Sequence, residues 1–189
     1  MHFDIKPIII TGGPGSGKSS LLDALKCEGF NCHLEVSRQI IIEQQTVNGT
    51  LMPWLNLSAF AEECYNRMLM IHSARSENIT FCDRGVFDII AYLKLGQICI
   101  DDKYFQTKRY YSAIAFICPP WKEIYVNDPQ RPQSFDESVS IYHSIVTTYT
   151  QSGFELIEVP LDTIENRKNW IINKLDLLKM PSLQLPNLS

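Results

Sequence analysis

The segment GGPGSGKS, residues 12–19, has the residue types and spacing of a loop that binds phosphate. Gly12, Gly17, Lys18 and Ser19 complete the pattern G-x-x-x-x-G-K-[ST]. The glycines let backbone N–H groups turn toward phosphate oxygens, and the helix that follows adds the positive end of its dipole. In this chemistry Lys18 reaches the β- and γ-phosphates of a nucleotide, and the Ser19 hydroxyl is a Mg²⁺ ligand. The residues predicted to bind the nucleotide here are Gly12, Gly13, Pro14, Gly15, Ser16, Gly17, Lys18, Ser19 and Ser20.

Asp83 is the expected acidic companion of this loop. It ends the mostly apolar run ITFCD, residues 79–83, which is typical of a buried strand. A carboxylate in that position can hold Mg²⁺ directly or through water. Asp83 could also cap the helix that follows, and the two roles are compatible.

Three further charged residues indicate what could happen to a bound phosphate. Glu35 could accept the proton of an attacking hydroxyl or help to order Mg²⁺. Arg84 and Arg131 could neutralise charge on a transferred phosphoryl group, since a guanidinium binds phosphate oxygens in pairs. Each also has a structural reading: Glu35 could pair with Arg38, Arg84 could form an ion pair with Asp83 or another acid, and Arg131 could be a solvated loop residue.

The elements that must position these residues alternate between strands and helices. Apolar runs predict strands at residues 7–11, 31–35, 79–83, 113–118 and 154–159. Helical periodicity predicts helices at residues 19–28, 38–45, 58–76, 86–95 and 101–111, and two more after Ser134 and Asp162. Ser134 and Glu137 have the spacing of a capping box. The helix after Ser134 is expected to bury Phe135, Val139, Tyr142, Val146 and Tyr149, and the last helix Ile164, Ile171, Leu175 and Leu178.

This alternation predicts an α/β fold with a parallel five-stranded sheet and helices on both faces. Ligands of such sheets bind beyond the carboxyl ends of the strands, where the candidate residues above converge. The motif at residues 12–19 lies between an apolar strand and an amphipathic helix, which argues against a chance match. We expect a single domain over residues 1–178, with a lid around residues 122–133 and a C-terminal tail at residues 179–189.

Composition excludes several other classes of protein. The net charge of −4 argues against an extended nucleic-acid partner, because proteins that neutralise many phosphates carry a basic face. No apolar run approaches the ~20 residues of a transmembrane segment, so we expect a cytoplasmic protein. The 6 cysteines include no C-x-x-C pair, which argues against a zinc ribbon or a redox motif. Several lie inside apolar runs, so we expect most of them to be reduced core residues.

The sequence also resembles the family of small P-loop AAA-type ATPase or kinase domains that includes the kinase domain of the NadR regulators and the Ttd-type translocation-defect ATPases. The resemblance spans residues 8–172 and follows the family's order. It is carried by the runs TGGPGSGKSSLLDALKCEGF, EVSRQIIIEQ, FCDRGVFDIIAYL, FICPPWKEIYVNDPQRPQSFDES and GFELIEVPLDTIENRKNWI.

The resemblance implies a fold related to nucleoside and nucleotide kinases and a role for each candidate residue. It implies that Glu35 serves the acceptor hydroxyl, that Asp83 and Arg84 form the acid–arginine pair after the third strand, and that Arg131 is the cation of the lid. The loop at residues 160–163, with Asp162, would hold the base. One departure is the run EVSR, where the family has proline after the glutamate, so the backbone that aims Glu35 differs.

These features predict an ATP- or GTP-dependent and Mg²⁺-dependent phosphotransferase acting on a small molecule such as a nucleoside or nucleotide. Two alternatives remain open at this point. One is a switch that hydrolyses the nucleotide, and the other is a nucleotide-binding adaptor that acts through protein or lipid partners. An acceptor pocket would lie between Glu35 and Asp83, and its candidate wall residues are Met52, Trp54, Phe60, Tyr65 and Arg67.

Overall fold

The computed structural model describes residues 5–74, 76–126 and 133–178, and its strands form one parallel sheet. The strand order is β2-β3-β1-β4-β5. The strands are β1 (Ile8–Gly12), β2 (Asn31–His33), β3 (Thr80–Asp83), β4 (Ile114–Cys118) and β5 (Glu155–Glu158). The predicted α/β fold with a five-stranded parallel sheet is therefore confirmed.

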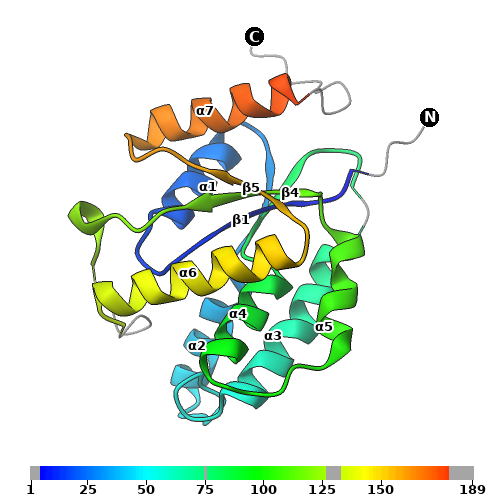
Figure 1. The fold of residues 1–189 in the computed structure, drawn as a ribbon, viewed down its shortest axis with the longest axis vertical. Coiled ribbons are helices and arrows are strands. Elements are labelled where there is room, and N and C mark those ends of the chain that lie inside the picture. The colour runs from blue at the N-terminus through cyan, green and yellow to red at the C-terminus, as the bar shows by residue number, and fades with distance from the viewer. Residues whose placement is uncertain (1–4, 75, 127–132, 179–189) are drawn as a thin grey trace.

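Helices connect the strands and cover both faces of the sheet (Figure 1). The α-helices are α1 (Lys18–Cys27), α2 (Val36–Thr46), α3 (Leu57–His72), α4 (Val86–Leu95), α5 (Asp102–Gln106), α6 (Phe135–Gln151) and α7 (Ile164–Leu177). Two short 3₁₀ helices are η1 (Thr107–Tyr110) and η2 (Lys122–Ile124). None of the helices in the described part of the chain has the length and apolar character needed to cross a membrane.

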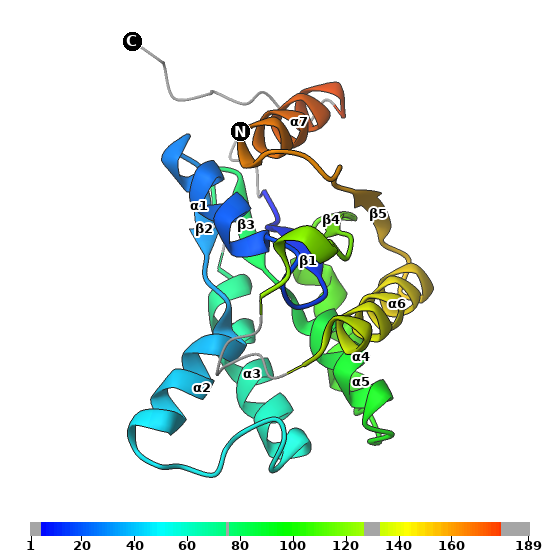
Figure 2. The same cartoon turned by 90° about the vertical axis from the view of Figure 1, so that its left-hand side faces the viewer.

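The core has two halves, one on each side of the sheet. Figure 2 shows α1 and α7 on one side and α2, α3, α4 and α6 on the other. The alternation of β1 explains this division, because successive strand residues point to opposite faces. Ile8 and Ile10 pack with the α1 and α7 side, whereas Ile9 packs with the side formed by the other helices. All three isoleucines are fully buried, so β1 anchors both halves.

The predicted capping box at the start of α6 is present. The Ser134 hydroxyl accepts a hydrogen bond from the Glu137 backbone N–H, and Glu137 Oε2 accepts one from the Ser134 N–H. The predicted buried stripe of α6 was right at Tyr149 but wrong by one position before it, because Ser138, Ile141 and Ile145 are buried rather than Val139, Tyr142 and Val146. The last helix, α7, begins after its N-cap residue Thr163. Leu178, the C-cap residue of α7, was predicted to be buried but is 37% exposed.

The second strand is shorter than predicted. It ends at His33, and Glu35 is the N-cap residue of α2 rather than the last residue of a strand. Val36, at the position where the family has proline, is the first residue of that helix and is buried. The helix therefore begins directly after Glu35, and packing of Val36 anchors the backbone that presents the carboxylate.

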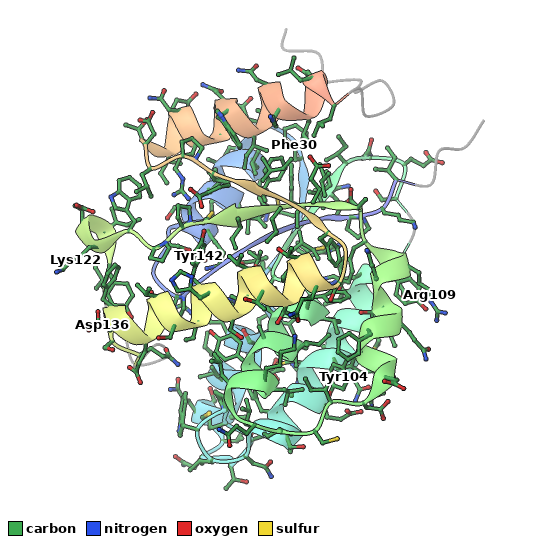
Figure 3. All side chains as sticks on the ribbon, viewed as in Figure 1. Phe30, Tyr104, Arg109, Lys122, Asp136 and Tyr142 are labelled. Carbon is green, nitrogen blue, oxygen red and sulfur yellow. The ribbon has the colours of Figure 1, made fainter. Side chains whose placement is uncertain are left out.

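The carboxyl ends of the strands meet at one edge of the sheet, where the ligand site was expected. Figure 3 labels Lys122 and Asp136, which flank this edge, and Arg109, which lies at the opposite end of the molecule. All 6 cysteines are free, as predicted, but only Cys64, Cys82 and Cys118 are buried.

Candidate active site

The loop at residues 12–19, called here the phosphate-binding loop, connects β1 to α1 and requires glycine at both ends. Gly12 has a φ of 139°, and a Cβ atom there would lie 2.3 Å from the Cys118 carbonyl oxygen of β4. Gly17 has a φ of 77° and is the N-cap residue of α1. Side chains at these positions would be strained or would clash, which explains the glycine spacing of the motif physically.

Lys18 folds back into the concave side of the phosphate-binding loop. Its ammonium donates to the Gly13 carbonyl oxygen at 2.7 Å and to Ser16 Oγ at 3.2 Å. Burial, followed by the nearby charge of Arg84, lowers the pKa of Lys18 to about 8. A phosphate group would supply the negative charge that this buried ammonium lacks, so the loop is prepared for an anion.

Arg167, which sequence reasoning missed, supports the loop from the other side. It comes from α7, is fully buried and donates from Nη2 to the Ser16 carbonyl oxygen at 3.2 Å. Its guanidinium lies 5.8 Å from the centre of the Trp121 ring. The sequence around it, IENRKNW, is polar and resembles an exposed helix face, so local pattern gave no signal of this contact.

Ser19 and Asp83 lie together at the mouth of the loop and could both ligate a divalent cation. Ser19 Oγ donates to Asp83 Oδ2 at 3.4 Å. Asp83 Oδ1 is buried and has no hydrogen-bond partner among the described residues. Burial, followed by the charge of Glu35, raises the pKa of Asp83 to about 6. An orphaned carboxylate oxygen beside a hydroxyl fits a bound cation, which would replace the missing partner.

Glu35 and Arg84 form an ion pair beside the phosphate-binding loop. Arg84 Nε donates to Glu35 Oε1 at 2.9 Å, and Arg84 Nη1 donates to the Gly12 carbonyl oxygen at 3.0 Å. The Ser37 hydroxyl also donates to Glu35 Oε1, at 2.8 Å. Burial alone would raise the pKa of Glu35, but the charges of Arg84 and Lys18 outweigh it and lower the pKa to about 2. Glu35 is therefore an ionised carboxylate held in a fixed orientation.

Asp88 holds the other side of Arg84 and was also missed by sequence reasoning. Asp88 Oδ1 accepts hydrogen bonds from Thr11 Oγ1 at 2.5 Å and from Arg84 Nη1 at 3.1 Å. Asp88 Oδ2 accepts from the Tyr149 hydroxyl at 2.6 Å and from the Gly85 N–H at 2.9 Å. The one signal available was an acid inside the otherwise apolar helix VFDIIAYL.

These contacts compensate a strained backbone at Arg84. Its φ is 70°, in the left-handed region that residues other than glycine rarely adopt. Strain of about 1–3 kcal/mol persists only where the surroundings over-determine the conformation, as the bonds to Glu35, Gly12 and Asp88 do here. The guanidinium is thereby fixed between the phosphate-binding loop and Glu35.

A cavity of about 410 Å³ opens from this cluster between α2, α3, α4 and the start of α6. Pro14 of the phosphate-binding loop, Glu35, Arg84 and Asp88 line its polar end. Its remaining walls are mostly apolar, and they consist of Ile41, Pro53, Trp54, Leu57, Phe60, Ala61, Cys64, Met68 and Ile89, with Ser37, Tyr92, Gln133 and Glu137. The volume lies within the range of small-molecule sites.

The structure brings only part of the predicted pocket wall to the cavity. Trp54 and Phe60 line it. Met52 is buried in the core cluster, Tyr65 packs against Tyr104, and Arg67 forms exposed ion pairs with Glu43 and Glu63, so these three predictions were wrong. Helical phase could have excluded Tyr65, which points away from the face shared by Phe60, Cys64 and Met68, but not Arg67, which is seven residues after Phe60 and lies on nearly the same side of α3.

Two other predicted residues have different outcomes. Asp162 is exposed and accepts hydrogen bonds from the Thr163 N–H at 2.6 Å and from Asn166 Nδ2 at 2.9 Å, so it stabilises the start of α7. Its predicted contact with the nucleotide base stays a prediction. Arg131, with the central part of the predicted lid, lies outside the described residues.

Comparison with solved structures places this arrangement among known folds. The fold is similar to that of a NadR protein solved in complex with NR, with a TM-score of 0.65, 13% identity and coverage of 92% of this chain and 50% of that chain. This chain therefore spans about half the length of that protein. Thymidylate kinase from Candida albicans also has a TM-score of 0.65, with 13% identity and 93% of each chain covered.

Shikimate kinase from Acinetobacter baumannii is similar as well, with a TM-score of 0.60, 14% identity and coverage of 93% of this chain and 96% of that chain. No curated protein sequence matches this chain significantly. A family profile described as an AAA domain matches residues 7–167. Because this match covers most of the chain, the protein belongs to this AAA domain family, and its fold is that of the small P-loop kinases.

Proposed function

We propose that this protein transfers the γ-phosphoryl group of ATP or GTP, bound with Mg²⁺, to the hydroxyl of a small molecule. The observation that carries the proposal is the junction between the phosphate-binding loop and the cavity. Pro14 lines both, and Glu35 and Arg84 lie where the two meet. A protein that only bound or hydrolysed a nucleotide would not need a second, partly enclosed pocket next to the phosphate-binding loop.

The phosphate-binding loop would hold the nucleotide and its metal ion. Backbone N–H groups of the loop and Lys18 would bind the phosphates. Ser19 and the orphaned oxygen of Asp83 would hold Mg²⁺, which when bound neutralises phosphate charge. The described residues contain no group of three or more His, Cys, Asp or Glu side chains that could hold a metal alone. Few protein ligands suit Mg²⁺, because it retains several waters and takes phosphate oxygens.

The two charged residues at the junction would then serve the transfer itself. The acceptor oxygen attacks the γ-phosphorus, the bond from phosphorus to the β–γ bridging oxygen breaks, and the nucleoside diphosphate leaves. The acceptor proton passes to the Glu35 carboxylate, whose Oε2 receives neither of the hydrogen bonds that Arg84 and Ser37 make to Oε1. Arg84 would stabilise charge on the phosphoryl oxygens during the transfer.

Similar folds support a small-molecule acceptor without identifying it. The solved neighbours are named as a thymidylate kinase, shikimate kinases, a deoxyadenosine kinase and a NadR protein in complex with NR. At 12–16% identity these likenesses show the fold, and the acceptor of this chain is a separate question. A transferase on this scaffold needs a pocket beside the γ-phosphate, and the cavity that adjoins the phosphate-binding loop at Pro14 would serve as one.

The experiment that tests the proposal compares consumption of Mg·ATP and Mg·GTP with and without pools of candidate acceptors. Consumption that depends on a pool supports the transferase. Phosphate release without any acceptor favours a hydrolysing switch, and nucleotide binding without consumption favours an adaptor; both results would overturn the proposal.

Glu35→Gln sharpens this test, because the amide keeps the size of the side chain but cannot accept the proton. It also removes the charge that pairs with Arg84, so far-UV circular dichroism must show that the variant is folded. We expect acceptor-dependent transfer to fall about 100-fold or more, with nucleotide affinity retained. Glu155→Gln, at an exposed position of β5, is the matched control and should leave transfer unchanged. Near wild-type transfer by Glu35→Gln would show that Glu35 does not accept the proton.

A further inference from the structure

We infer that the acceptor is an uncharged alcohol with a compact apolar body, rather than a nucleotide, a free nucleoside or a cyclic polyol that carries a carboxylate. This inference rests on the proposed function, because it concerns the occupant of the same cavity. Three features of the cavity support it: its apolar depth, its charge balance and the hydrogen bonds that its polar groups already make.

The depth of the cavity is apolar because of the helical spacing of α3. Phe60, Cys64 and Met68 recur every fourth residue, and Ala61 lies beside them on the same face. Ile41 of α2 and Ile89 of α4 add aliphatic walls. Moving a ligand from water into contact with these side chains lowers the free energy only if the surface of the ligand is itself apolar.

The charge balance of the cavity disfavours an anionic acceptor. Its described lining contains three carboxylates, Glu35, Asp88 and Glu137, and one guanidinium, that of Arg84. Arg84 is already paired with both Glu35 and Asp88. An acceptor that carried a phosphate or carboxylate would therefore meet net negative charge in a partly enclosed site, where such repulsion is strong.

The polar groups of the lining also leave little for a nucleobase to bind. Asp88 accepts four hydrogen bonds from the protein, and Glu35 Oε1 accepts two. Gln133 and Glu137 come from the start of α6 and its preceding segment rather than from α3, and α6 meets the phosphate-binding loop where Ser138 approaches Gly13. Tyr92 adds one hydroxyl, about one turn along α4 from Asp88. A base has several donors and acceptors on its edges, and leaving them unpaired in an apolar wall would oppose binding.

The test measures kcat/KM for acceptor-dependent consumption of Mg·ATP and Mg·GTP by the full chain. The uncharged apolar probes are benzyl alcohol, 2-phenylethanol and cyclohexylmethanol. The uncharged polar probes are thymidine and adenosine, and the anionic probes are thymidine monophosphate and shikimate. We expect kcat/KM for the best apolar alcohol to be at least about tenfold higher than kcat/KM for any polar or anionic probe. Tenfold is the lower end of the discrimination that one small group produces in an apolar pocket.

Two variants connect this preference to the cavity wall. Ala61→Leu fills the apolar depth and should lower kcat/KM for the best alcohol about 100-fold while nucleotide affinity stays unchanged. Cys64→Ala enlarges the same wall with a smaller risk to folding, and it should shift the preference toward the bulkier alcohols. Far-UV circular dichroism establishes that each variant is folded.

The outcomes separate the inference from the proposed function. A preference for thymidine, adenosine, thymidine monophosphate or shikimate overturns the inference while leaving the phosphotransferase standing. An apolar preference that neither variant alters also overturns it, because the alcohol would then bind elsewhere. Nucleotide consumption that no acceptor stimulates overturns the proposed function itself.

Discussion

Replacing Asp88 by asparagine should destabilise the protein strongly, although the side chain keeps its size. Asp88 is 2% exposed and accepts hydrogen bonds from Thr11, Arg84, Tyr149 and the Gly85 N–H. In asparagine one of the two oxygens becomes an NH₂ group that only donates. The hydroxyls of Thr11 and Tyr149 can rotate and accept from it, whereas the Arg84 and Gly85 N–H groups cannot.

The magnitude follows from this geometry. If the NH₂ group replaces Oδ1 it faces Arg84 Nη1, and if it replaces Oδ2 it faces the Gly85 N–H, so one donor–donor conflict remains in either orientation. Arg84 also loses one of its two ionic partners in a buried site. Breaking a buried pair by removing one partner costs about 3–5 kcal/mol. We therefore expect the free energy of unfolding of Asp88→Asn to fall by about that amount.

Urea unfolding at pH 7, followed by far-UV circular dichroism, measures this change. Asp176→Asn, an exposed aspartate near the end of α7, is the control and should change the free energy of unfolding by less than about 0.5 kcal/mol. Thr11→Val removes only one of the four hydrogen bonds and should lie between the two, at about 1–2 kcal/mol. If Asp88→Asn lowers the free energy of unfolding no more than Asp176→Asn does, Asp88 does not hold Arg84 as described.

Three further predictions address the phosphate-binding loop and a buried histidine. Lys18→Ala should remove nucleotide binding measurable by calorimetry, since it deletes the cation inside the loop, and normal affinity would refute the phosphate assignment. Gly12→Ala should destabilise the protein by about 3 kcal/mol or prevent folding, because its Cβ would lie 2.3 Å from a backbone oxygen at a φ of 139°. The control Gly96→Ala, whose nearest neighbour is the end of the Leu57 side chain, should cost clearly less in the same urea unfolding assay. Burial, followed by the charge of His33, lowers the pKa of His72 to about 3, below its unfolded value of 6.5, so His72 contributes stability above pH 6.5 that is lost as the pH falls toward 3. Between pH 7 and pH 5 the wild type should therefore lose about 1–2 kcal/mol more than His72→Phe, and an equal loss in both proteins would contradict the assignment.

The strands and most helices could be predicted because their signals are local. The isoleucines of β1 and the apolar run of α4 are buried almost regardless of what surrounds them, and α4 has the bounds that its pattern predicted. The stripe of α6 was misplaced because Ser138 and Thr148 are buried, and a polar residue at a buried position hides the true phase of a helix. The end of β2 was misplaced because α2 starts directly after Glu35, with no turn residue between strand and helix to mark the boundary.

The candidate site was predictable where its residues are contiguous and not where they are distant in sequence. The phosphate-binding loop is a single segment, so its glycines and lysine identify it directly. For Arg84 the sequence offered a structural ion pair with Asp83 or another acid as the alternative to a phosphate-binding role, and the acids that it pairs with are Glu35 and Asp88. That choice depends on a left-handed φ at Arg84 and on the position of α2, neither of which periodicity reveals. Arg167 reaches the loop from α7, 151 residues from Ser16, and could be found only from the fold.

The most direct test of the central claim is the identity of the phosphorylated product. Phosphorus-31 NMR of the wild-type protein with Mg·ATP or Mg·GTP and the acceptor probes should show a new phosphomonoester signal with an equal amount of nucleoside diphosphate. That signal should depend on the acceptor and be absent for Lys18→Ala. Inorganic phosphate as the only product, or an unchanged triphosphate at millimolar concentrations, would contradict the assignment of this protein as a phosphotransferase.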